Sequence, residues 1–150
     1  MLLTDFPIVE DVYQLTPAWS LTLPGQFKRR IEDGDLVLWN PDLTLWIAVW
    51  NNDQGQSKEA RLASIKKLMS ADAFDLTSST SAGILRFSYR LQEAEPEPAS
   101  ANEDAEPVAA FYCFALGDSG QVEIAIYLDK EDDISQAQAI LQSLTETPAS

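Results

Sequence analysis

The stretch LVLWNPDLTLWIAVWNN, residues 36–52, decides the fold class, because apolar residues alternate on both sides of a turn signal. Proline suits the second position of a type I turn, so Asn40-Pro41-Asp42-Leu43 is expected to reverse the chain. The flanking segments 35–39 and 44–50 then form an antiparallel hairpin. Its predicted register pairs Trp39 with Thr44, Leu38 with Leu45, Val37 with Trp46 and Leu36 with Ile47.

Both faces of the predicted hairpin are apolar, since residues that pair across two strands share a face. One face is aliphatic, consists of Leu36, Leu38, Leu45, Ile47 and Val49, and is expected in the core. The other, the Trp face, consists of Val37, Trp39, Trp46, Ala48 and Trp50 and is the candidate partner-binding face. It is either covered by a helix or by the apolar N-terminal segment (Phe6, Ile8, Val9, Val12, Tyr13), or open to a partner.

Alternation predicts four further strands, and a helical repeat of apolar residues predicts two helices. The strands are 19–23, which Pro24-Gly25 ends, 84–91, 109–116 and 121–128; the helices are 58–70 and about 133–145. Ser57 is placed to cap the first helix, whose apolar stripe is Leu62, Ile65, Leu68 and Met69. The sequence therefore predicts one α+β domain over residues 1–150, with an antiparallel sheet of about six strands and two main helices, ordered strands-helix-strands-helix.

The net charge of −14 is concentrated in the second part of the chain. Residues 91–150 carry one basic and 13 acidic side chains, and six of the acids lie in EAEPEPASANEDAEP, residues 93–107. That segment is predicted to be a disordered acidic loop within the domain. Such acidity argues against nucleic acid and anionic membrane as partners, because both need a positive surface. The candidate basic patch is Lys28, Arg29 and Arg30, which is placed to receive an acidic partner or the chain's own acidic loop.

Catalytic motifs are scarce. The chain contains no histidine, which excludes Ser-His-Asp and Cys-His catalysis as well as histidine metal sites. GDSG at 117–120 is therefore predicted to be a hairpin turn, with no base available to Ser119.

The acidic segment after residue 128 does not fit a calcium loop. A loop starting at Asp129 would need Gly and Glu at the positions of Ile134 and Ile140. Cys113 reads as an inert core thiol. We predict no catalytic residue, metal site or cofactor, although two carboxylates can act as general acid and base.

The segment WSLTLPGQF, residues 19–27, resembles the strand-then-proline start of PsbP-like and DcrB-like α/β/α sandwich domains. The two-strand unit, helix, three-strand meander and C-terminal helix that follow are similar in order, so the resemblance covers most of residues 17–146. Members of that fold mostly act as binding, assembly or chaperone proteins, including bacterial cytoplasmic chaperones of secreted effectors. The resemblance implies a binding role and assigns no residue a function.

The N-terminus does not have the pattern of a signal peptide, because no basic residue precedes Lys28 and Asp5 interrupts the apolar run. We therefore expect a cytoplasmic protein.

The last helix is expected to add an uncharged outer face of Ser135, Gln136, Ala139, Gln142 and Ser143. The leading hypothesis is a non-enzymatic protein-binding module of the bacterial cytoplasm, a chaperone, adaptor or immunity-type inhibitor, acting as a monomer or homodimer. The alternative is a small-ligand-binding protein or carboxylate-dependent hydrolase with a Trp-lined pocket.

Overall fold

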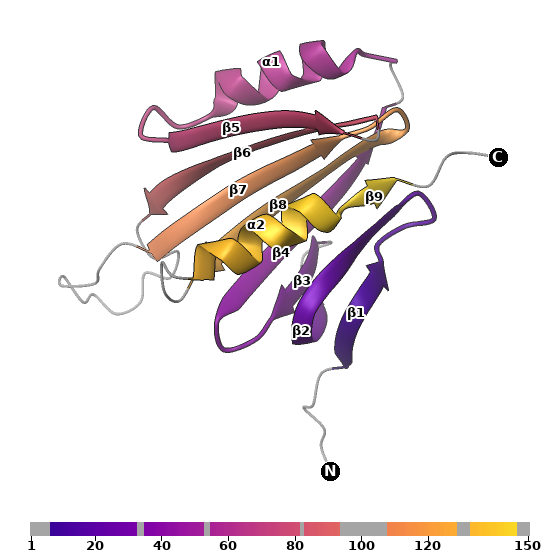
Figure 1. Cartoon of the computed structure of the whole chain (residues 1–150), viewed down its shortest axis with the longest axis vertical. Coiled ribbons are helices and arrows are strands. Elements are labelled where there is room, and N and C mark those ends of the chain that lie inside the picture. The colour runs from indigo at the N-terminus through magenta and orange to yellow at the C-terminus, as the bar shows by residue number, and fades with distance from the viewer. Residues whose placement is uncertain are drawn as a thin grey trace.

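One antiparallel sheet dominates the fold (Figure 1). The computed structural model describes residues 7–32, 35–52, 55–81, 83–93, 108–128 and 133–146. Within these ranges the strands are β1 (Ile8–Gln14), β2 (Trp19–Glu32), β3 (Asp35–Trp39), β4 (Leu43–Asn51), β5 (Phe74–Ser81), β6 (Ile84–Glu93), β7 (Val108–Leu116), β8 (Gly120–Leu128) and β9 (Thr145–Glu146). The helices are α1 (Lys58–Leu68) and α2 (Ile134–Ser143). The strand order is β1-β2-β3-β4-β8-β7-β6-β5, and β9 pairs with β2.

The sheet is larger than the sequence predicted. The described residues form nine strands, so the expectation of an α+β domain with about six strands is wrong, and the fold is dominated by its sheet. The missed strands are β1, β5 and β9. Every residue of β5 is exposed, so this Ser- and Thr-rich strand has no buried face to produce alternation. An edge strand of this kind is held mainly by backbone hydrogen bonds, here to β6. Backbone pairing does not depend on which side chains are present, so the sequence pattern did not predict this strand.

Strand β2 runs through Pro24-Gly25, which was expected to end it. Val9 of β1 pairs with Phe27 and Asp11 pairs with Leu23, so three residues of β2 bulge opposite one residue of β1. Proline is tolerated at a bulge because no ladder hydrogen bond is required of it there. The second half of β2 therefore continues along β3, and it brings the basic patch beside the hairpin.

The predicted hairpin is confirmed in every pair of its register, from Leu36 opposite Ile47 to Trp39 opposite Thr44. The side chain of Asn40 holds the turn: its Oδ1 accepts the backbone N–H groups of Asp42 and Leu43, each at 2.8 Å. The aliphatic face belongs to the main core, as predicted. Leu38, Leu45 and Ile47 are buried there, and Leu36 and Val49 pack against them.

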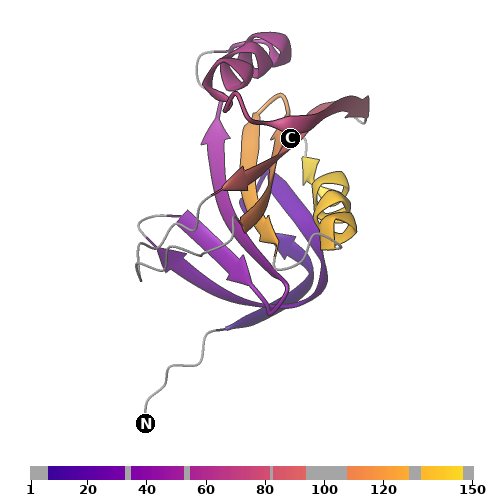
Figure 2. The same cartoon turned by 90° about the vertical axis from the view of Figure 1, so that its left-hand side faces the viewer.

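The two helices cover opposite faces of the sheet. Helix α2 packs on the main core through Ala137, Ile140 and Leu141. Helix α1 packs on a smaller aromatic cluster, which consists of Phe87, Tyr89, Phe114 and Leu116 with Leu62, Ile65 and Met69 against it. Figure 2 shows α1 at one end of the twisted sheet and α2 against its flank. The face that carries α1 is also the face of Trp46, because β4, β8, β7 and β6 pair in continuous register.

Local signals placed the helices well. Ser57 caps α1, with its Oγ accepting the N–H of Ala60 at 3.0 Å, as predicted. One expectation is wrong: Leu68 is 88% exposed rather than part of the buried stripe. The C-terminal end of α2 is held by Arg86 of β6, which donates to the carbonyls of Leu141 and Leu144 at 3.1 and 2.7 Å.

Two further findings concern the described residues only. No helix among them is long and apolar enough to cross a membrane. The predicted acidic loop at 93–107 lies outside the described residues except for Glu93, whose backbone ends β6 and pairs with Val108 of β7. The acidic segment thus joins two neighbouring strands of the same sheet.

Candidate functional site

The Trp face is buried at one end and open at the other. Val37 is fully buried, Trp39, Trp46 and Ala48 are half-buried, and Trp50 is 57% exposed. The five residues lie on one side of β3 and β4, as predicted from the alternation. The two ends of this face therefore differ: Trp39 is partly covered, whereas Trp50 is open to solvent.

Trp39 is covered by an arginine of this chain. The guanidinium carbon of Arg30 lies 4.7 Å from the centroid of the Trp39 ring and 6.0 Å from that of Trp46. Glu32 holds the guanidinium in place through an ion pair of 2.8 Å. An arginine over an indole face is an attractive arrangement, because the ring face carries partial negative charge. The cover was expected from a helix or from the N-terminal segment, and sequence reasoning missed Arg30 in this role.

The described part of the N-terminal segment, from residue 7 onward, does not cover the Trp face. It forms β1 at the edge of the sheet, where Val9 and Tyr13 pack against the main core on the opposite side. Ile8 and Val12 are 61% and 67% exposed, and Phe6 lies outside the described residues.

The basic patch is divided by the strand that carries it. Lys28 pairs with Trp39 and Arg30 pairs with Val37, so both belong to the Trp face. Arg29 lies on the other face, where its Nε donates to the hydroxyl of Tyr13 at 2.7 Å. The three residues therefore do not form one surface for an acidic partner, and only Lys28 and Arg30 share a face.

Beyond Trp46 the sheet face opens into a groove of about 770 Å³. Helix α1 forms one wall through Arg61, Ser64, Ile65 and Leu68. Strands β4, β8, β7 and β6 form the floor through Trp46, Ile47, Ala48, Gln121, Glu123, Ile124, Ala125, Tyr112, Phe114 and Tyr89. Trp50, Asn51, Asn52, Gln56 and Asp35 complete the lining. The groove exists because α1 covers only the β6–β7 end of this sheet face.

Aromatic rings give the floor of the groove a rigid surface. The rings of Tyr89 and Tyr112 stack with centroids 5.2 Å apart and planes at 18°. Tyr89 also packs against Phe114 at 6.1 Å, and Phe114 packs against Phe87 at 6.0 Å. These pairs are neighbours across β6 and β7, so the backbone register fixes their positions.

Three charged side chains line the groove among the described residues. Glu123 lies on the floor, and its carboxylate accepts a hydrogen bond of 2.8 Å from Gln121 Nε2. Asp35 is exposed at the end of β3. Arg61 is only 7% exposed, and it donates to the carbonyls of Gly117 at 2.6 Å and Gly120 at 3.0 Å. Its Nε has no hydrogen-bond partner in the described part of the chain.

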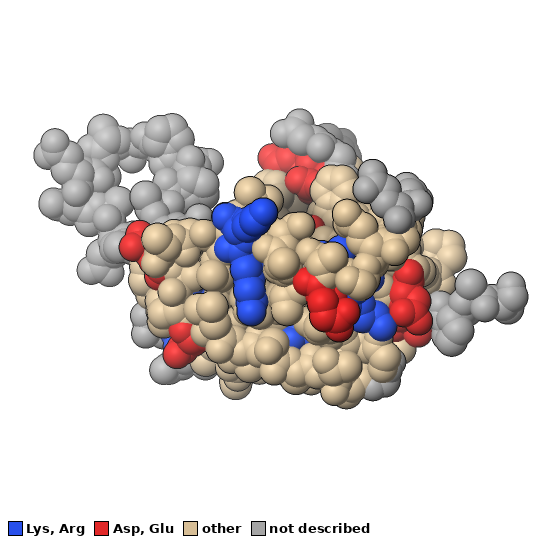
Figure 3. Space-filling model, turned by 90° about the horizontal axis from the view of Figure 1, so that it is seen from above, with Lys and Arg blue, Asp and Glu red and all other residues tan. Residues whose placement is uncertain are grey.

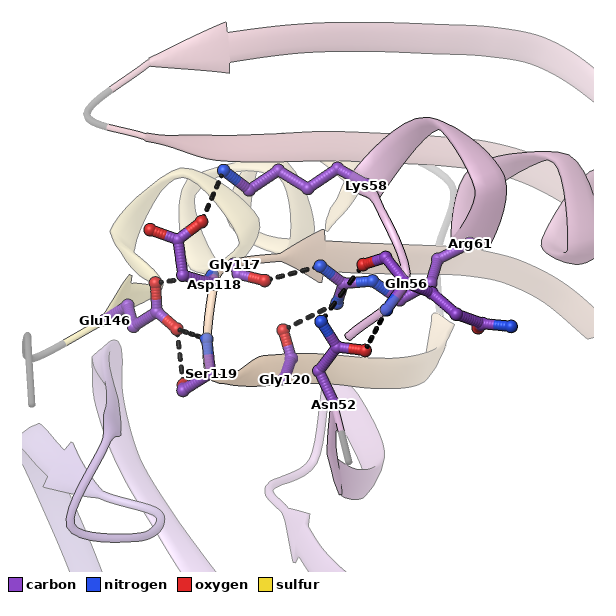
Figure 4. Close-up of polar contacts among 9 residues, drawn as sticks. All are labelled: Asn52, Gln56, Lys58, Arg61, Gly117, Asp118, Ser119, Gly120 and Glu146. Atoms are coloured by element: carbon purple, nitrogen blue, oxygen red, sulfur yellow. Dashed lines mark hydrogen bonds and ion pairs between the residues drawn. The ribbon is translucent and has the colours of Figure 1, made fainter. Parts of the chain in front are cut away.

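The GDSG segment is a hairpin turn between β7 and β8, as predicted, and side chains from α1 and β9 hold it (Figure 4). Arg61 holds two of its carbonyls, and Lys58 pairs with Asp118 at 2.9 Å. Glu146 accepts the N–H groups of Asp118 and Ser119 at 3.1 and 2.8 Å. The Ser119 hydroxyl also donates to Glu146.

Ser119 was expected to have no base available, and the structure places the Glu146 carboxylate in contact with its hydroxyl. The contact is a turn clamp, because the same carboxylate already holds two backbone amides and so keeps the turn closed. Twenty-seven residues separate Ser119 from Glu146, so no local motif signals their contact.

The described residues contain no group of three or more Cys, Asp or Glu side chains arranged to hold a metal ion. Cys113 is buried in β7, and burial raises the pKa of its thiol. Seen from the α1 end, the surface is mostly uncharged, with a few basic and acidic side chains spread over it (Figure 3). The site is therefore an aromatic groove with few charges.

Comparison with known proteins adds no family assignment. No family model matches the chain, and no curated protein matches it in sequence.

Proposed function

We propose that this chain is a non-enzymatic protein-binding module of the bacterial cytoplasm, and that the groove beside α1 binds an apolar segment of its partner. The observation that carries the proposal is the exposure of Trp50, 57%, and Leu68, 88%, on opposite sides of one groove. Two large apolar side chains that face water around a concave surface are typical of a site that is filled on binding.

The dimensions of the groove support a peptide-sized occupant. Its volume of about 770 Å³ lies within the range of roughly 300–1,000 Å³ that is common for sites burying one compact ligand or a few side chains. Tryptophan and tyrosine supply large contact areas with little loss of conformational entropy, and both are frequent among residues that dominate binding energies. The stacked Tyr89 and Tyr112 rings are already ordered, so an occupant does not have to order them.

The resemblance to PsbP-like and DcrB-like domains favours the same class of function, since those domains mostly bind or assemble other proteins. A chaperone, an adaptor and an immunity-type inhibitor all use such a surface. The uncharged outer face expected on α2 belongs to this proposal as a second surface, although Ser143 already contacts β2 through Thr22.

A second candidate function is binding or hydrolysis of a small ligand. The observation that favours it is the presence of Asp35 and Glu123 in the same groove as Trp46. Two carboxylates beside an aromatic platform are the groups that a carboxylate-dependent hydrolase uses. This candidate predicts that a small molecule, rather than a peptide, saturates the groove and protects Trp50 from acrylamide quenching.

The experiment that tests the proposed function is selection of random dodecapeptides by phage display on the immobilised protein. Peptides are expected to bind the wild type and to lose about tenfold in affinity on Trp50→Ala, because a truncated hot-spot aromatic costs about 1–2 kcal/mol or more. Ile31→Ala is the matched control, since Ile31 is also 57% exposed but pairs with Leu36 on the other face.

Equal binding of the selected peptides to the wild type and to Trp50→Ala would remove the groove as their site. A homodimer that forms at micromolar concentration and is lost in Trp50→Ala would identify a second copy of this chain as the occupant. Sedimentation at several protein concentrations, run beside the display experiment, distinguishes these outcomes.

A further inference from the structure

We propose that the groove is specific for a basic side chain, Arg or Lys, presented by an apolar peptide segment of the partner. The Glu123 carboxylate is its counter-ion, and the rings around Glu123 are its walls. This inference rests on the proposed function and names the chemistry of the partner. The observation behind it is the place of one carboxylate in a floor that is otherwise uncharged and largely aromatic.

Glu123 lies near the middle of the sheet, where a carboxylate is unusual. Its cross-strand neighbours on the same face are Ala48 of β4 and Phe114 of β7. The side chain is half-buried, and it forms no ion pair with any described Lys or Arg. Its recorded contact is the hydrogen bond from Gln121, which leaves most of the acceptor positions of the carboxylate unused. A half-buried carboxylate without a cation gains from an incoming positive group, because part of its hydration is already lost.

Arg61 does not supply that positive group. Both of its terminal nitrogens are engaged by the carbonyls of Gly117 and Gly120, and the side chain is only 7% exposed. Two of its five N–H donors are engaged in holding the GDSG turn, and its Nε has no hydrogen-bond partner among the described residues. An anionic occupant would meet the remaining N–H groups of this one largely buried guanidinium together with two carboxylates, Glu123 and Asp35. The balance of charge in the groove thus favours a cation.

The rings of the groove suit a cation as well as an apolar chain. Trp46, Trp50, Tyr89 and Tyr112 all line it, and tryptophan and tyrosine faces attract guanidinium and ammonium groups. The same chain shows the arrangement next to the groove, where Arg30 lies 4.7 Å from the centroid of Trp39 and also near Trp46. A basic side chain from a partner would extend this arrangement along the sheet face from Trp46 to Trp50.

Long-range electrostatics favours the same partner. The chain has a net charge of −14, which attracts basic segments and repels acidic ones before any contact is made. A basic and apolar segment is therefore attracted in two ways. The net negative charge of the whole molecule attracts it at a distance, and the Glu123 carboxylate pairs with it in the groove. The two effects are separable, because only the second depends on Glu123.

The test uses three dodecapeptide display libraries that are random except for one central position, fixed as Arg, Gln or Glu. On the full-length wild type, the Arg library is expected to yield about tenfold more bound phage than the Gln library, and the Glu library the least. Glu123→Gln keeps the shape and one acceptor of the side chain but removes its charge, so it is expected to reduce the preference for Arg over Gln to the small part that the net charge of the chain sustains. Glu10→Gln is the matched control, because Glu10 is an exposed carboxylate on β1 at the far edge of the sheet.

The outcomes separate the inference from the proposed function. Equal recovery of the three libraries, with recovery still lost in Trp50→Ala, would overturn the charge preference and leave the groove as a peptide site. A preference for Arg that Glu123→Gln and Glu10→Gln reduce by the same amount would also overturn it, since net charge alone would then explain the selection. Absence of binders from all three libraries would overturn both proposals. Circular dichroism of Glu123→Gln confirms that the variant is folded.

Discussion

The guanidinium of Arg30 lies over the ring of Trp39, 4.7 Å from its centroid, and so joins two segments that the sequence analysis treated separately. Pairing of β2 with β3 places Arg30 opposite Val37, on the face that the tryptophans share. One end of that face is thereby covered from within the chain, and the other end, at Trp50, opens into the groove. The exposed rings of this protein are therefore fewer than its hairpin alone suggests.

Removal of the Arg30 side chain is expected to uncover Trp39 and Trp46. Arg30→Ala should lower the free energy of unfolding by about 1 kcal/mol, the usual size of a partly exposed cation–π contact. It should also increase acrylamide quenching of tryptophan fluorescence. Lys28→Ala is the control from the same face, and it should change neither quantity noticeably because the structure records no ring contact for Lys28. Urea titration and quenching measure both effects, and unchanged quenching in Arg30→Ala would refute the assigned cover.

Arg61 is expected to contribute strongly to stability, because it is a buried charged residue that holds two backbone carbonyls. Arg61→Met keeps the apolar volume but removes the Arg61 donors from both carbonyls, so that Gly120 retains only the N–H of Gly117. The expected loss is about 2–4 kcal/mol in the free energy of unfolding, since hydrogen bonds from charged groups contribute about 1.5–3 kcal/mol each. Arg61→Lys should recover only part of it, because an ammonium does not present two donors in a fixed fork. Denaturant unfolding provides the measurement, and a loss below the scatter of the method would show that the turn does not depend on Arg61.

Loss of the Glu146 clamp on the GDSG turn is expected to lower the free energy of unfolding by less than loss of Arg61 does. Glu146→Gln removes the charge of the carboxylate that accepts hydrogen bonds from the N–H groups of Asp118 and Ser119. It should lower the free energy of unfolding by about 1–2 kcal/mol. Amide hydrogen exchange should accelerate at residues 118 and 119 and stay unchanged at the turn formed by Asn40. Glu10→Gln again serves as the control, since it removes an exposed carboxylate far from the turn. Equal exchange rates in the wild type and Glu146→Gln would contradict the clamp.

Cys113 predicts a pH dependence of stability. Burial raises the pKa of its thiol, whereas the unfolded thiol ionises above roughly pH 8.5. The unfolded state therefore releases a proton that the folded state keeps, and the free energy of unfolding falls as pH rises beyond that value, by up to about 1.4 kcal/mol per pH unit. Cys113→Ala should lack this slope, although its stability at neutral pH is lower. Denaturant unfolding between pH 7 and pH 10 compares the two slopes, and a thiol reagent that labels the native protein rapidly would contradict the buried, protonated thiol.

Those parts of the fold that follow from local chemistry could be predicted from the sequence. Proline and asparagine in the turn, together with strict alternation on both sides, determined the whole register of the hairpin. Ser57 marked the start of α1 for a similar reason, since a side-chain cap acts within one turn. The alternation of β8 also placed Glu123 on the face opposite Val122, and that signal could have pointed to the carboxylate in the groove.

The remaining features depend on contacts between distant segments. Strand β5 has no buried face, and Pro24 looks like a strand end unless its bulge against β1 is known. The groove arises only when α1 is placed over one end of the sheet, and the approach of Arg30 to Trp39 needs the β2–β3 register. None of these contacts can be predicted from the residue pattern within a short stretch of sequence. That is why the hairpin was predicted residue by residue, whereas only Trp46, Ala48 and Trp50 of the groove lining belong to the predicted Trp face.

The most direct test of the central claim, that the groove binds a peptide at its open aromatic end, is a titration of the indole N–H signals in a ¹H–¹⁵N spectrum. The chain has four tryptophans, and single Trp→Phe variants assign their signals. On addition of the tightest dodecapeptide from the Arg library, the signals of Trp50 and Trp46 are expected to move with a common saturation curve. Those of Trp19, buried in the main core, and Trp39, beneath Arg30, should stay in place. Saturable binding that leaves the Trp50 signal unmoved would contradict the account.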